Sequence, residues 1–101
     1  MGDSMKYTKV PEPHRSLLFR LVEIYREHAE PTSGVIPFWE YGPARKLMLY
    51  DKLLDRYSSS NLHFLEDLGY LTILPWRIDS VDGTVLKQQA LNYYDYSHSR
   101  V

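Results

Sequence analysis

The sequence of 101 residues contains no cysteine. This absence excludes a disulfide framework, a thiolate metal site and a cysteine nucleophile. Long apolar runs are also missing: each run is only a few residues long, whereas a membrane-spanning helix needs about 20. No charged-then-apolar segment opens the chain, so we expect neither secretion nor a membrane span and predict a cytoplasmic location. Residues 1–4 either belong to the native chain or precede a native Met5.

Neither sign of charge is in large excess. The chain has 12 basic and 13 acidic residues, which give a net charge of -1. This balance excludes a polybasic nucleic-acid binder, so binding to nucleic acid would require a local basic patch. The hydrophobic share of 44% and the charged share of 25% are typical of globular proteins, and the length predicts one domain.

Recognisable catalytic, cofactor and metal motifs are missing as well. The sequence has no Gly-x-Ser-x-Gly element, no phosphate-binding glycine loop and no convincing acid–base pair. The four histidines are scattered, and no two of them share one turn of a helix. We therefore predict a protein that is not an enzyme and that has no cofactor and no metal site.

The first half of the chain predicts two amphipathic helices separated by a strand. Residues 14–30 place apolar side chains on one helical stripe, after an extended entry at 11–13. Residues 35–41 mix β-branched and aromatic side chains, which favours a short strand or a packed loop, and Pro37 favours an edge position. Residues 44–57 again carry leucines and tyrosines at helical spacing, on a face broader than one core needs.

A third helix is predicted after the second. Ser58 or Ser59 caps its start, because a serine hydroxyl can accept a hydrogen bond from an otherwise unpaired backbone N–H. The leucines that follow are spaced to face inward, and Gly69 suits the left-handed position that ends a helix.

Residues 71–94 predict two strands joined by a tight turn. Aspartate followed by glycine, at Asp82-Gly83, suits the two positive φ angles of a hairpin turn. Pro75 weakens the first strand, and a helix over residues 85–94 is the alternative to the second strand.

The order helix, strand, helix, turn, helix and hairpin resembles the winged helix-turn-helix superfamily over residues 13–94. The resemblance is carried by the helix over Leu47 to Tyr57, by the run SSSNLHFLEDLGYLTI that starts at Ser58, and by the hairpin around Asp82-Gly83. It implies an α+β fold, a small winged helix domain of three helices with a C-terminal β-hairpin wing. The chain then divides into a flexible N-terminal segment (1–10), the winged helix domain (11–94) and a C-terminal tail (95–101).

The same resemblance implies a sequence-specific DNA-binding protein that acts as a transcription regulator. Its third helix would enter the major groove of double-stranded DNA, and the wing would touch the flanking backbone. Hydroxyl, amide and imidazole groups at the start of that helix would contact the DNA, while basic side chains would hold phosphates. The candidate DNA-binding residues are Arg45, Lys46, Arg56, Ser59, Ser60, Asn61, His63, Arg77 and Lys87.

A protein–protein interaction module without DNA binding is the alternative function. The balanced charge, the broad apolar face of residues 44–57 and an aromatic content of 14% fit that role equally well. Its anchors would be Phe38, Trp39, Tyr41, Trp76 and the tyrosines near the C-terminus. We also predict a homodimer, formed by the first helix together with Tyr93, Tyr94 and Tyr96.

Overall fold

The fold is α+β, as the sequence predicts, and its main feature is an antiparallel sheet of five strands. The structure is a computed structural model that describes residues 10–78 and 81–99. Within these residues the sheet has the order β3-β2-β1-β5-β4 and is accompanied by three α-helices and one π-helical turn, η1. The elements along the chain are α2 (His14–Ile24), η1 (Tyr25–Ala29), β1 (Ile36–Tyr41), β2 (Lys46–Leu49), β3 (Lys52–Leu54), α3 (Ser59–Asp67), β4 (Leu71–Ile78), β5 (Val81–Leu86) and α4 (Gln88–His98).

The predicted winged helix domain is wrong, because residues 44–57 form the strands β2 and β3 instead of a second helix. Arg45 and Tyr50 have positive φ angles of 54° and 60°, which an α-helix does not contain. Leu47 and Leu49 are both buried and alternate with Met48, which is the two-residue period of a strand. The leucines and tyrosines of this segment fit both periods, and pairing with β1 selects the strand.

The predicted C-terminal hairpin is only partly correct. The strands β4 and β5 do pair, but Asp82 and Gly83 lie inside β5, opposite Pro75 and Leu74, and do not form the turn. The chain then enters α4, so the helical alternative is correct from Gln88 onward. A helix therefore follows the hairpin that was expected to end the domain, and the expected boundary at residue 94 falls inside that helix.

Pro37 was expected at a sheet edge, yet β1 is the central strand and pairs with both β2 and β5. The carbonyl oxygen of Pro37 accepts a hydrogen bond of 2.8 Å from the backbone N–H of Tyr50, so the backbone of Pro37 faces the β2 side. Tyr50, the residue opposite, lies in the turn just after β2, so the missing N–H of Pro37 falls at the end of the ladder between β1 and β2.

The first and third predicted helices are confirmed. Helix α2 follows Pro13 and continues into η1, where the bond from the N–H of Glu30 to the carbonyl of Tyr25 spans five residues. Helix α3 follows Ser58 in extended conformation, and Gly69 has a positive φ angle of 90° just after its end.

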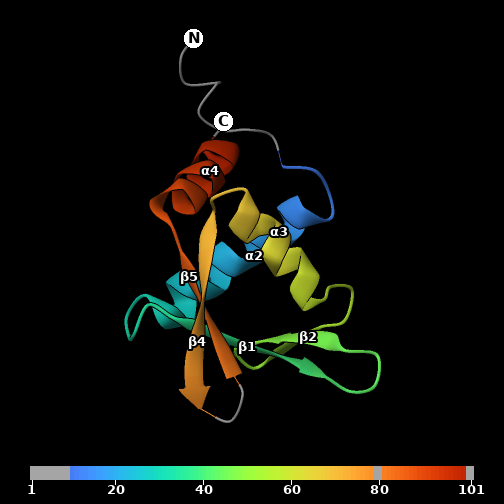
Figure 1. Cartoon of the computed structure of the whole chain (residues 1–101). Helices are drawn as coiled ribbons and strands as arrows, with labels where there is room; N and C mark the ends of the chain where they lie inside the picture. The colour runs from blue at the N-terminus through green and yellow to red at the C-terminus, as the bar shows by residue number, and fades with distance from the viewer. Residues whose placement is uncertain (1–9, 79–80, 100–101) are drawn as a thin grey trace.

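The sheet presents two different faces. Register and alternation place Ile36, Phe38, Leu47, Leu49, Leu71, Thr84 and Leu86 on one face, and all seven are buried. Helix α2 contacts α3 and α4, while α3 packs on β4 and α4 on β5. Figure 1 shows the helices gathered on one side of the β1–β2 ribbon. The core therefore lies between this inner face and the helices.

Each helix in the described ranges is too short or too polar to cross a bilayer.

Candidate functional site

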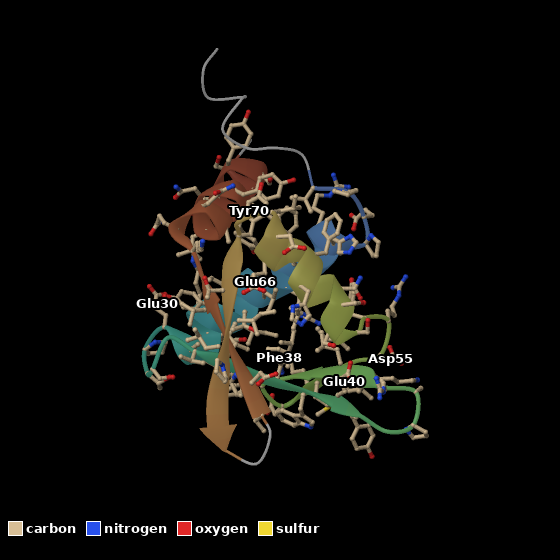
Figure 2. All side chains as sticks on the ribbon, viewed as in Figure 1. Glu30, Phe38, Glu40, Asp55, Glu66 and Tyr70 are labelled. Carbon is tan, nitrogen blue, oxygen red and sulfur yellow. The ribbon has the colours of Figure 1, made fainter. Side chains whose placement is uncertain are left out.

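The start of α3, where the base-reading residues were expected, is bonded to the rest of the protein. Ser59 Oγ donates a hydrogen bond of 2.7 Å to Glu40 Oε2 on β1. Asn61 Oδ1 accepts from the N–H of Ser58 at 2.9 Å, and Asn61 Nδ2 lies 3.1 Å from His14 Nε2 on α2. In Figure 2, Glu40 lies on β1 beneath the start of α3. This end of the helix therefore faces β1 and α2.

The other two expected contact residues on α3 are exposed. Ser60 Oγ lies 2.8 Å from Ser58 Oγ, within the cap of the helix. His63 Nδ1 lies 3.6 Å from Glu66 Oε1 one turn further along, so the imidazole has a carboxylate beside it. Only these two of the four predicted base-reading side chains point to solvent.

A groove of about 510 Å³ lies beside this helix start. It is lined by Phe38, Trp39, Glu40, Ser59, His63, Val81 and Asp82. Among the residues that the structure describes, its lining contains the carboxylates of Glu40 and Asp82 but no lysine or arginine. Like charges repel at short range, so the groove disfavours a phosphate group.

The predicted phosphate-binding residues are not all gathered in one patch, because Lys87 lies far from Lys46 along the sheet. Arg45 lies in the turn between β1 and β2, Lys46 is the first residue of β2, and Arg56 lies in the segment between β3 and α3. Lys87 occupies the position just before α4, and the register places it about eight residues along the sheet from the row that contains Lys46, roughly 25 Å at strand spacing. Arg77 belongs to β4, but its side chain lies outside the described part of the structure.

The second face of the sheet, which we call the outer face, carries large apolar side chains. It consists of the side chains that alternate with the buried ones: Pro37, Trp39, Tyr41, Lys46, Met48, Leu53, Thr72, Leu74, Gly83 and Val85. Register places Trp39, Met48 and Leu53 in one row across three strands, and Pro37, Gly83 and Leu74 in the next row.

The outer face is not covered by the described residues. Apart from Gly83, each of its residues is at least partly exposed, in contrast to the seven buried residues of the inner face. Tyr41, Leu53 and Leu74 are 59%, 47% and 40% exposed. Lys46 is the single charged residue of this face among the strand positions that the structure describes, and none of those positions is acidic.

Both edges of the sheet are protected against the addition of another strand. The N–H of Ile73, on β4, donates to Glu66 Oε2 at 2.9 Å, so the free side of this strand is capped from α3. The backbone of Pro75, two residues further along β4, faces the same free side, and proline has no N–H to donate to an added strand. At the opposite edge, β3 spans only three residues. Contacts with other proteins are therefore expected on the faces of the fold.

The surface that was predicted to form a homodimer is largely internal. Helix α2 buries Leu17, Leu18, Leu21, Val22 and Ile24 in the core. Tyr93 is only 6% exposed, and its ring lies 5.6 Å from the ring of Phe19 and 5.7 Å from that of Tyr70. The Tyr94 hydroxyl donates a hydrogen bond of 3.2 Å to Glu23. Tyr96 is 50% exposed to solvent. These tyrosines mainly attach α4 to α2.

Sequence reasoning missed Met48, Leu53 and Leu74 as members of an exposed surface. The first two were assigned to a helix, and Leu74 was assigned to a hairpin whose turn was expected at Asp82-Gly83, whereas Leu74 pairs with Gly83 itself. Leu47, Met48 and Leu49 are all apolar, so the sequence carries no two-residue period there, and their alternation is visible only in the burial.

Metal-binding side chains do not converge in the described ranges, where no group of three or more His, Asp or Glu residues could hold an ion. Comparison with protein families, with curated proteins and with solved structures finds no match to this chain. The function therefore has to be inferred from the groove and the outer face.

Proposed function

We propose that this chain is a protein-interaction domain that binds another protein surface through its outer face. The observation that carries the proposal is that one face of the sheet is buried under helices while the opposite face, with Trp39, Met48 and Leu53 in one row, has no cover from the described residues.

The composition of the outer face supports this role. Trp, Tyr and Met are enriched at protein interfaces, whereas Asp and Glu are depleted from their centres. Trp39, Tyr41 and Met48 all belong to this face, and none of its described positions is acidic. Covering apolar surface gains about 25 cal/mol per Å², so exposed aliphatic side chains such as Leu53 and Leu74 supply a driving force for association.

The geometry also restricts the manner of binding. A partner that added a strand to the sheet would need a free edge, but Glu66 and Pro75 close the edge at β4. A partner that stacks on the outer face needs neither edge. The proposal is therefore face-to-face docking of a folded surface.

DNA binding stays a prediction, and the arrangement gives it less support. Ser59 and Asn61 are already bonded to Glu40 and His14, and two carboxylates line the groove beside them. Affinity for DNA depends on clustered cations that displace counterions from phosphates. Arg45 and Lys87 lie at opposite ends of the sheet.

Site-specific photo-crosslinking tests the proposal with a matched pair of tyrosines. A benzophenone amino acid replaces either Tyr41, which is 59% exposed on the outer face, or Tyr96, which is 50% exposed on α4. We expect a discrete protein adduct from position 41 that disappears in a Leu74→Glu background, and no such adduct from position 96. Equal adducts from both positions, or none from position 41, would refute the role of the outer face.

A parallel titration with random-sequence duplex DNA separates the two functions. If the chain binds only proteins through its apolar face, it should show no salt-sensitive binding to DNA. A DNA-binding domain, in contrast, loses affinity for DNA as the salt concentration rises. Salt-sensitive binding that Arg45→Ala and Lys46→Ala weaken would favour the DNA function.

A further inference from the structure

We infer that the occupant of the outer face is a second copy of this chain, stacked face to face about a two-fold axis. This inference rests on the proposed function, because it identifies the partner of the same surface. It differs from the homodimer predicted from the sequence, whose surface on α2 is used inside the monomer.

The distribution of charge permits the face to meet itself. The two central rows, Trp39 with Met48 and Leu53 and Pro37 with Gly83 and Leu74, contain no charged residue. Lys46 lies in an end row, next to Tyr41. A copy brought onto this face therefore meets apolar rows with apolar rows, and no charged side chain among the described positions is buried in the middle.

The position of Lys46 also avoids repulsion between the copies. Lys46 is the first residue of β2 and lies at the rim of the outer face. A lysine stem can lie along apolar surface while its ammonium group reaches water, so the two ammonium groups can stay solvated and apart when two copies stack.

The size of the outer face suits a small symmetric interface. The outer face has ten positions in the described strands, and no row of it crosses all five strands. At about 4.8 Å by 6.7 Å for each position, two such faces project to roughly 640 Å², and side-chain relief raises the accessible area they bury toward the lower limit of about 1,000 Å² for a specific interface. We therefore expect a dimer that dissociates on dilution.

The protected edges favour this closed arrangement over open growth. Edge pairing would let further copies add in sequence, but Ile73 is capped by Glu66 and Pro75 has no N–H to donate. Stacking of the outer faces uses one such face on each copy, so assembly stops at two. Two sheets stacked in this manner form a sandwich with helices on both outer sides.

Sedimentation velocity across a range of micromolar concentrations tests the inference on the full chain. We expect the wild-type protein to shift from monomer to dimer as concentration rises. Leu74→Glu places a charge in one of the two apolar rows of the outer face and should leave a monomer at every concentration. Leu68→Glu is the matched control, because Leu68 is 37% exposed beyond α3 and Leu74 is 40% exposed, and it should dimerise like the wild type.

Several outcomes would overturn the inference. A wild-type monomer at all concentrations would do so, as would a dimer that Leu74→Glu leaves intact or that Leu68→Glu abolishes. Circular dichroism of both variants shows whether they fold. If Leu74→Glu does not fold, Met48→Glu supplies a second variant of the outer face. If the wild type is monomeric but position 41 still crosslinks to a different protein, the proposed function holds and only the self-association fails. If position 41 gives no adduct, both fail.

Discussion

The carboxylate of Glu66 on α3 accepts a hydrogen bond of 2.9 Å from the backbone N–H of Ile73 on β4. This contact occupies a backbone donor at the free edge of β4. Figure 2 shows Glu66 on α3, on the side toward β4. With Pro75 two residues further along, the edge offers little to an incoming strand. The fold thus closes one route of association while leaving the apolar outer face open.

Glu66→Ala should destabilise the protein by about 1–2 kcal/mol, because the Ile73 N–H loses a charged acceptor in a partly buried position. The same change reopens the edge of β4, so we also expect faster aggregation on heating. Denaturant unfolding and light scattering measure the two effects. Glu66→Gln keeps an acceptor oxygen and should lose less than half as much stability. Equal losses in the two variants would contradict the capping role.

Asn61→Ala should destabilise the protein by about 1–2 kcal/mol, because this amide accepts from the N–H of Ser58 and also contacts His14. Ser60→Ala removes an exposed hydroxyl whose contact is Ser58 Oγ, and should change stability by less than about 0.5 kcal/mol. Thermal unfolding of both variants provides the comparison. If Ser60→Ala were the more damaging change, the assignment of Asn61 as the capping partner would be wrong.

The helices and the sheet were not equally predictable from the sequence. Helix α2 has one apolar stripe and a proline before it, and α3 has a serine cap and Gly69 after it, so local signals alone locate both. Residues 44–57 satisfy both a helical and a strand pattern, and the pairing of β2 with β1 decides between them. That pairing is a long-range contact that no local pattern contains.

The site was less predictable than the fold. Ser59 and Asn61 were correctly placed at a helix start, but their partners Glu40 and His14 are 19 and 47 residues away. The outer face could not be recognised without the register, because a shift of one residue exchanges the two faces of a strand. In β5, for example, Asp82 was expected in a turn and instead lies on the inner side of the sheet opposite Phe38.

Acid should weaken the attachment of α4 to η1. The hydrogen bonds from the Arg26 guanidinium, at 2.7 and 3.0 Å, hold the pKa of Asp95 below its ordinary value. A lowered pKa in the folded state means that this stabilisation is present above the unfolded pKa and is lost as pH falls through the folded value. The loss is therefore expected below about pH 4. It should stay under about 1 kcal/mol, because both side chains are more than a third exposed.

Asp95→Asn tests this pH dependence. The variant should be less stable than the wild type at neutral pH, and the difference should shrink as the pH falls below about 4. Asp67→Asn, at the exposed end of α3, is the control and should not reproduce that change. Urea unfolding at a series of pH values gives the free energies. A difference that is constant with pH would show that Arg26 does not act through the charge of Asp95.

Thr84→Val should stabilise the protein by roughly 1 kcal/mol, because it removes a buried hydroxyl whose hydrogen-bonding capacity is unused. Thr84 is fully buried on the inner face between Ile36 and Ile73, and its Oγ1 has no hydrogen-bond partner among the described residues. Valine has nearly the same shape and suits a strand, so the core should need little repacking. Thr84→Ser is the control: it keeps the hydroxyl but loses a methyl group, so it should destabilise. If Thr84→Val is less stable than the wild type in denaturant unfolding, the hydroxyl contributes to stability and the prediction is wrong.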